Sequence, residues 1–334
     1  MKPAPVGVEI VRGDVVESVH RVHVVVVDGA GSVVHEAGDA SFVTYLRSAA
    51  KPFQAVPLVT SGAADAFGLT KQELALCCGS HSGEPLHVET AARMLEKGGV
   101  SAALLQCGTH APRSKLAKDA LKGGRTTPLH HNCSGKHAGM MLLQKHLGGD
   151  PADYWQRDSA AQQAILRSVA EVAGMPQGDV RVGTDGCSAP NFALPLSNAA
   201  LLFARLAMPQ GVAPPSAAAL ARLRDAMVHH PEMVGGGESF DTDLMGASDD
   251  RLVAKAGAEG CEGVGDLRTG MGLFLKAEDG AGRPVPPATI EALRQLAWLE
   301  GRAFEVLGTW WMPTLTNWSG RVVGRVKPVL TLGP

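Results

Sequence analysis

The order of residue patterns along the chain limits its fold more than any other feature. Residues 6–40 are rich in β-branched side chains and alternate, with a turn at Asp28-Gly-Ala-Gly. This pattern predicts two or three antiparallel strands. Strand-like sequence returns at 251–257 and 261–276, and again at 322–331. Because such segments occupy both ends of the chain, we expect both termini to join one sheet.

Helical spacing fills the middle of the chain. Pro52 is tolerated only in the first turn of a helix, so a helix is predicted to begin close to Ser48. More helices are predicted at about 70–78, 85–98, 114–122, 136–147, 155–173, 191–207, 215–229 and 287–307. The sequence thus predicts an α+β fold in a single domain. An antiparallel sheet part at about 1–47 and 248–334 would carry a helical part at about 48–247.

The composition excludes several classes of protein. With 334 residues, 45% hydrophobic and 19% charged, the chain can bury a substantial core. A net charge of -2 without a basic stripe argues against a nucleic-acid partner and favours a small molecule. We see no signal-peptide pattern and no apolar run long enough for a bilayer, so a cytoplasmic protein without membrane contact is expected.

A serine and a lysine three residues apart form the first candidate site. Ser48 and Lys51 would share one face of a helix and come within hydrogen-bond reach. A lysine that is buried at a helix start can lose its proton and serve as the base for the hydroxyl. Free N–H groups at the same helix start can hold an oxyanion. The spacing is common by chance, so other segments must support it.

Two further segments supply candidate partners. The polar turn Cys78-Gly-Ser-His-Ser-Gly-Glu offers Ser80 as a second hydroxyl with room for a ligand, although it also reads as a helix cap. Lys255 lies at the end of a predicted strand beside small residues, from where it can reach into a groove. Taken alone it reads as a solvated lysine of an edge strand.

Cysteines and a lysine form a candidate metal site. Cys133 and Lys136 stand in a loop that opens a helix, and Cys187 follows a predicted strand with Asp185 beside it. Thiolate and amine donors suit zinc, yet the spacing matches no standard zinc motif. A lysine must also lose its proton to bind metal. Buried free thiols are the alternative interpretation, and we read the other four cysteines as packing residues.

Four motifs in this order give the chain a family resemblance. Tyr45-Leu-Arg-Ser-Ala-Ala-Lys-Pro-Phe-Gln and Cys78-Gly-Ser-His-Ser-Gly-Glu are followed by His131-Asn-Cys-Ser-Gly-Lys-His-Ala-Gly-Met and Thr184-Asp-Gly-Cys-Ser-Ala-Pro-Asn. Together they resemble the L-asparaginase family of the rhizobial inducible, thermolabile type. The resemblance implies a fold similar to serine β-lactamases and glutaminases. It also implies hydrolysis of L-asparagine to aspartate and ammonia, and a homodimer.

The resemblance also implies roles for single residues. It makes two pairs, Ser48 with Lys51 and Ser80 with Lys255. It assigns zinc to Cys133, Lys136 and Cys187, where the metal orients substrate and does not activate water. Arg47 and Asp185 would bind the substrate's carboxylate and α-ammonium by charge complementarity. Asp241 matches a position that lines the site.

The expected mechanism is acyl transfer to a serine. Lys51 takes the Ser48 proton while the oxygen attacks the amide carbon, ammonia departs, and water cleaves the acyl-enzyme. In a rival assignment Ser80 attacks. Two other functions stay open at this point: a penicillin-recognising or esterase-like serine hydrolase, and a non-catalytic zinc-dependent amino-acid-binding protein.

Overall fold

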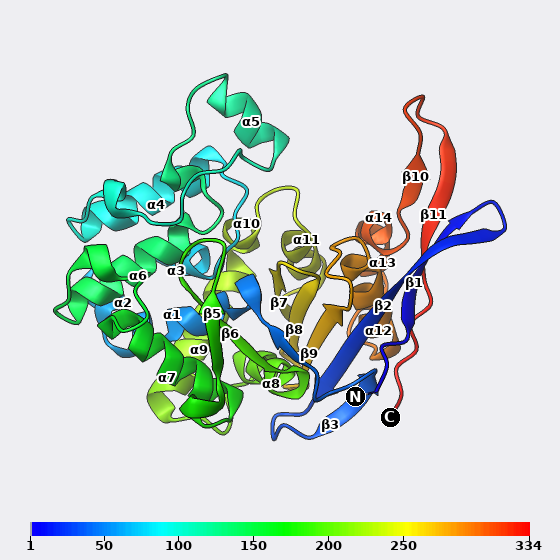
Figure 1. The fold of residues 1–334 in the computed structure, drawn as a ribbon, viewed down its shortest axis with the longest axis horizontal. Coiled ribbons are helices and arrows are strands. Elements are labelled where there is room, and N and C mark those ends of the chain that lie inside the picture. The colour runs from blue at the N-terminus through cyan, green and yellow to red at the C-terminus, as the bar shows by residue number, and fades with distance from the viewer. Residues whose placement is uncertain (1) are drawn as a thin grey trace. The chain divides into compact units, whose positions relative to one another are not determined.

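The computed structural model describes residues 2–334 (Figure 1). These residues form two compact units. The sheet unit comprises residues up to 49, 194–208 and 243–334. The helical unit comprises residues 50–193 and 209–242. The expectation of a single domain stays a prediction.

The sheet unit is built on one antiparallel sheet that both ends of the chain enter. Its strand order is β10 (Thr314–Thr316), β11 (Val322–Pro328), β1 (Val6–Arg12), β2 (Val15–Val27), β9 (Gly272–Ala277), β8 (Cys261–Asp266) and β7 (Leu252–Gly257), with β3 (Val33–Ala37) paired to β2. The predicted turn at Asp28 joins β2 to β3. The prediction of an α+β fold whose termini share an antiparallel sheet is confirmed.

The centre of this sheet is buried because helices cover it. Helix α8 (Leu196–Ala207) packs against β8 and β9, and α12 (Val285–Gln295) packs against β9, β11 and β1. Gly263 and Gly272 let α8 lie close, since a Cβ at either position would collide with Phe203 or with the α8 backbone. Residues 24–27 of β2 are completely buried, as expected for a strand at the centre of a sheet.

The remaining short elements complete the sheet unit. They are β4 (Val43–Tyr45), the 3₁₀ turn η1 (Arg47–Ala50), α11 (Phe240–Ala247), α13 (Ala303–Val306) and α14 (Gly308–Trp311), of which η1 and α11 extend past the boundary of the unit. In Figure 1 the β1–β2 and β10–β11 hairpins meet where β1 pairs with β11, and their turns point in different directions.

The helical unit packs several helices around α1 (Lys51–Thr60). They are α3 (Lys71–Cys78), α6 (Ser134–His146), α7 (Ala160–Ala173) and α9 (Pro214–His229), with α2 (Ala63–Ala66), α4 (Pro85–Lys97), α5 (Lys115–Leu121) and α10 (Pro231–Val234) around them. Four 3₁₀ turns lie between them, namely η2 (Ala102–Leu104), η3 (Pro128–His130), η4 (Pro151–Asp153) and η5 (Gln177–Asp179). Strand β5 (Arg181–Thr184) follows and pairs with β6 (Pro190–Pro195). No helix within residues 2–334 combines the length and apolar character needed to cross a bilayer.

Local chemistry explains where α1 and α3 begin and how α1 tolerates a proline. Pro52 lies in the first turn of α1, where its missing N–H costs nothing. Pro57 lies inside the helix and leaves the Phe53 carbonyl without its usual donor, but Ser168 of α7 donates to that oxygen at 3.5 Å. Thr70 opens α3 with a reciprocal capping box to Glu73. The helix start predicted close to Ser48 is confirmed.

Two predicted helices are wrong in part. Residues 190–195 form strand β6 before α8 because Pro190 and Pro195 bound the segment, and a residue that precedes a proline is driven to extended conformation. The long helix predicted at 287–307 ends at Gln295. Ala297 takes a positive φ of 54°, and the chain then turns so that Trp298 becomes buried.

Candidate active site

Lys51 and Ser80 meet within the helical unit. Lys51 begins α1 and is 1% exposed, while Ser80 is partly exposed in the turn after α3. The Lys51 Nζ lies 2.9 Å from Ser80 Oγ, 2.5 Å from the Gly79 carbonyl oxygen and 3.3 Å from the Asn132 carbonyl oxygen. The sequence pairs Lys51 with Ser48, whereas the structure places its amine against Ser80, the second predicted serine.

Tight backbone packing fixes the turn that carries Ser80. The Ser80 N–H donates to the Val234 carbonyl at 2.7 Å. A Cβ on Gly79 would lie 2.5 Å from the Met233 carbonyl oxygen, so only glycine fits there without a shift. Glu84 accepts hydrogen bonds from Ser82 Oγ at 2.8 Å and from the Gly237 N–H at 3.2 Å. The serine is therefore held by α10 and the glycine-rich loop behind it.

Two neutral histidines support the same turn. The rings of His81 and His87 stack with centroids 4.9 Å apart. Burial lowers the pKa of both imidazoles, that of His81 well below 6.5. His81 Nδ1 accepts from the Gly83 N–H, so its Nε2 carries the proton and donates to Ser134 Oγ at 2.9 Å. The histidine of the Ser80 motif is thus a structural group and not a free base.

The surroundings of Lys51 match those of a general base. A neutral amine has two N–H groups and one lone pair. In the structure Lys51 Nζ donates to the carbonyl oxygens of Gly79 and Asn132 and to Ser80 Oγ. Once the amine has lost its proton, its lone pair can accept the hydroxyl proton of the adjacent Ser80. This arrangement can activate a serine for attack on a carbonyl carbon.

Three other predicted residues lie in the sheet unit. Ser48 is half-buried in η1, and Lys255 is buried on β7 with its Nζ 2.8 Å from the Ala256 carbonyl. A Cβ on Gly257 would collide with the Leu46 carbonyl, so the segment before Ser48 packs on the end of β7. Arg47 has a positive φ of 53° and its guanidinium lies 3.7 Å from Glu259. Such a strained backbone is a feature of functional sites.

The predicted metal ligands converge in the helical unit. Lys136 Nζ lies 3.0 Å from Cys187 Sγ, and that sulfur lies 3.9 Å from Asp185 Oδ2. A hydrogen bond with Cys187 and the charges of Lys51 and Lys136 hold the pKa of Cys133 well below its usual range despite burial. Burial opposes the charge on Lys136, but Cys187 and Cys133 outweigh it and raise the lysine pKa.

This donor set suits zinc. Two thiols and an amine are ligands that zinc accepts, and an oxygen donor, Asp185, lies beside them. Across residues 2–334, no three His, Cys, Asp or Glu side chains are grouped so that they could hold a metal ion. A metal at this cluster would therefore depend on the Lys136 amine. The remaining predicted residue, Asp241, is 2% exposed at the start of α11, and its role stays a prediction.

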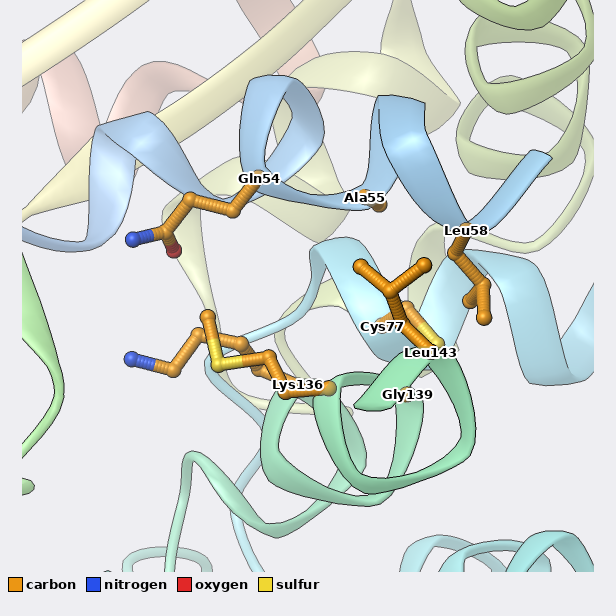
Figure 2. A pocket seen from close by; sticks show the side chains of 8 residues that line it. Gln54, Ala55, Leu58, Cys77, Lys136, Gly139 and Leu143 are labelled. Carbon is orange, nitrogen blue, oxygen red and sulfur yellow. The ribbon is translucent and has the colours of Figure 1, made fainter. Parts of the chain in front are cut away.

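Sequence reasoning did not single out two buried polar residues beside this cluster. His137 shares a hydrogen bond of 2.6 Å with the Tyr154 hydroxyl, and Gln54 lines a small cavity together with Lys136 (Figure 2). Both stand inside the four quoted motifs, and both are polar in otherwise apolar helical segments. That contrast is the signal in the sequence that could have identified them.

Comparison with known proteins gives one family and several distant structures. A family model described as L-asparaginase II matches residues 8–328. No curated protein matches the sequence significantly.

Three solved structures illustrate the distant likenesses. Mglu in its glutamate form is 13% identical with a TM-score of 0.47, over 84% of this chain and 61% of that one. This chain thus spans less than two thirds of the length of Mglu. A beta-lactamase from Mycobacterium bovis is 14% identical with a TM-score of 0.42, over 82% and 94% of the two chains. A class C beta lactamase from Rhodobacter sphaeroides is 14% identical with a TM-score of 0.42, over 83% and 94%.

The family model covers almost the whole chain, including the segments that carry Lys51, Ser80, Cys133, Lys136 and Cys187. The chain therefore belongs to the L-asparaginase II family.

Proposed function

We propose that the chain is an L-asparaginase that hydrolyses L-asparagine to L-aspartate and ammonia through a serine nucleophile. The contact of 2.9 Å between Lys51 Nζ and Ser80 Oγ carries the proposal. Membership of the L-asparaginase II family supports the choice of an amide substrate. The four quoted motifs narrow that choice to asparagine.

In the mechanism we propose, Lys51 is the base and Ser80 attacks. Ser80 Oγ forms a bond to the side-chain amide carbon of asparagine while its proton passes to the neutral Lys51 Nζ. Lys51 then gives this proton to the departing ammonia as the C–N bond breaks. Water attacks the resulting ester, Lys51 accepts the water proton and returns it to Ser80, and aspartate leaves.

Substrate binding is assigned by charge. Asp185 Oδ2 lies 3.9 Å from Cys187 Sγ, and this carboxylate can take the α-ammonium of asparagine. Following the resemblance of the motifs, we assign the substrate carboxylate to Arg47 and a site-lining position to Asp241. Cys133, Lys136 and Cys187 would hold zinc, which supplies a fixed positive charge that orients the substrate. The serine and lysine already provide the nucleophile, so no water needs to be activated by metal.

An ammonia-release assay on asparagine and glutamine tests the activity. We expect ammonia from asparagine with the wild-type chain and a loss of at least about a thousandfold in the Ser80→Ala and Lys51→Met variants. Ser101→Ala, at an exposed serine that only caps η2, is the matched control and should keep full activity. Binding of asparagine without ammonia would favour an amino-acid-binding protein, and turnover of nitrocefin would favour a penicillin-recognising hydrolase.

Trapping of the acyl-enzyme decides between the serines. Mass spectrometry after rapid acid quench should find the added acyl group on Ser80. A label on Ser48 with Ser80 unmodified would refute our assignment and restore the pair predicted from the sequence. The Ser48→Ala and Lys255→Met variants then measure how much the second pair contributes to turnover.

We also propose that the protein is a cytoplasmic homodimer that does not contact a membrane. Exposed apolar side chains on the β1–β2 and β10–β11 hairpins support an association surface, among them Val19, Val322 and Trp318. Sedimentation velocity should give twice the chain mass. A Val19→Lys variant should shift the protein toward the monomer. A wild-type protein that sediments as a monomer would refute the dimer.

A further inference from the structure

Two buried polar atoms beside the cysteine–lysine cluster make no hydrogen bond within residues 2–334. They are Gln54 Oε1 and His137 Nε2. A buried polar atom without a partner costs free energy, so each requires an explanation. The side chains lie on different helices, α1 and α6, and are 5% and 0% exposed. Gln54 lines a cavity together with Lys136, and His137 interacts with Cys187, so each of the two residues is close to a predicted zinc ligand.

Gln54 offers an acceptor beside the Lys136 amine. Its Nε2 donates to the Pro190 carbonyl at 3.4 Å, and since a carbonyl can only accept, Oε1 is the atom left over. Gln54 and Lys136 line one cavity of about 10 Å³, which has room for about one water. Figure 2 shows the Gln54 amide and the Lys136 Nζ extending toward the same side of this cavity, whose other walls are apolar.

His137 offers a donor beside the Cys187 sulfur. The Tyr154 hydroxyl accepts from the Gln106 N–H at 2.8 Å and gives its own proton to His137 Nδ1 at 2.6 Å. This leaves the His137 proton on Nε2. The Cys187 thiol is a neighbour of the imidazole that can take a hydrogen bond from it. His137 also follows Cys133 by four residues, so it occupies the same face of α6 as that ligand.

We propose that Gln54 and His137 are positioning residues that orient the zinc ligands. Gln54 Oε1 accepts an N–H of the Lys136 amine, directly or through one water in the cavity, and thereby turns the nitrogen lone pair toward the metal. His137 Nε2 donates to Cys187 Sγ and fixes the sulfur that binds the metal. Such outer partners change metal affinity by about 10–100-fold. The proposal rests on the zinc site of the proposed function, although not on asparagine turnover.

Zinc affinity measured on the full chain tests this without any activity assay. Metal is removed by chelation, and zinc is returned in competition with a chromophoric chelator. Cobalt substitution adds a second readout, the thiolate-to-cobalt charge-transfer band. Gln54→Met and His137→Asn each remove one of the two atoms at similar side-chain size. Gln54→Glu keeps an acceptor, and His137→Gln places a donor near the original Nε2 position.

We expect Gln54→Met and His137→Asn to weaken zinc binding by about 10–100-fold and to alter the cobalt band. Gln54→Glu and His137→Gln should restore most of the affinity. Tyr154→Phe, a milder change, should weaken zinc binding less than His137→Asn does. Gln144→Met is the control, because Gln144 is a buried glutamine of α6 whose amide accepts from the Ala161 N–H away from the cluster. It should lower the thermal midpoint without changing zinc affinity.

Three results would overturn the proposal. Unchanged zinc affinity in Gln54→Met and His137→Asn would show that neither residue orients a ligand. An equal loss of zinc affinity in the Gln144→Met control would show that the loss comes from general destabilisation of the fold. A wild-type chain that binds no zinc would refute the metal site together with this inference. A chain that binds zinc as expected but releases no ammonia would refute the proposed activity alone.

Discussion

A single added methyl group at Gly79 should separate Lys51 from Ser80. Gly79 has φ -85° and ψ 159°, a conformation that alanine adopts freely, so Gly79→Ala introduces no backbone strain of its own. The new Cβ would lie 2.5 Å from the Met233 carbonyl oxygen, where an ordinary contact begins at 3.4 Å. The turn must therefore move by 3.4 minus 2.5, or about 0.9 Å.

The expected cost follows from that displacement. Overpacking of this kind destabilises by about 1–3 kcal/mol. A shift near 1 Å in a catalytic group costs roughly a hundredfold in rate. The Gly79 carbonyl and the Ser80 hydroxyl both contact Lys51, so the movement changes two of its hydrogen bonds together. We expect a lower thermal midpoint and a kcat reduced by about a hundredfold, with a smaller effect on KM.

The matched control is Gly178→Ala, in the same unit. No heavy atom lies within 4 Å of a Cβ at Gly178, so this variant should match the wild type in stability and turnover. The measurements are thermal unfolding and ammonia release from asparagine. Full activity in Gly79→Ala would show that the close contact between Lys51 and Ser80 is not needed for turnover, and the reasoning would fail.

The remaining predictions concern pH and charge. Burial lowers the pKa of His81 and His87 below 6.5, so the unfolded chain binds protons that the folded helical unit does not. Stability should be complete above about pH 6.5 and should fall as the pH drops below it. His87→Gln, which can keep the hydrogen bond to the Glu232 carbonyl, should flatten this acid slope in urea titrations, and an unchanged slope would contradict the assignment. Asp266→Ala should cost about 3–5 kcal/mol in the sheet unit because it leaves the Arg251 guanidinium buried without its carboxylate. Asp119→Ala breaks an exposed ion pair with Lys115 and should lower the free energy of unfolding by less than about 1 kcal/mol in urea titrations. Equal losses of stability in Asp119→Ala and Asp266→Ala would refute the argument from burial.

The fold was predictable where side-chain periodicity and burial agree. The alternating segment at 6–40 became β1, β2 and β3, and most predicted helices begin and end within a few residues of the observed ones. The failures occur where tertiary contacts outweigh local preference. The segment after Gln295 has helical spacing, yet the chain leaves the helix there and buries Trp298. Where the helix ends depends on what Trp298 packs against, and the local sequence pattern carries no information about that contact.

The candidate site was predictable only where its residues are neighbours in sequence. Cys133 and Lys136 were placed together because one short motif at the start of a predicted helix carries both of them. The contact between Lys51 and Ser80 joins residues 29 positions apart and follows from the packing of α1 on α3. His137 was missed for another reason, since its partners Tyr154 and Cys187 are both distant in sequence and no local pattern brings them to the imidazole.

The direction of helical side chains explains why Lys51 reaches Ser80. Side chains on an α-helix lean toward its N-terminus, so a lysine in the first turn extends past the helix start and not along its flank. Lys51 is the first residue of α1, and Ser80 comes two residues after the end of α3, which packs against α1. The two groups therefore meet where one helix begins and the other ends. The spacing rule that pairs positions i and i+3 requires both residues to lie in regular α-helix, whereas Ser48 lies in the 3₁₀ turn before it. A lysine at the first position of a helix should accordingly be matched with hydroxyl groups at the ends of neighbouring helices as well as with those close in sequence.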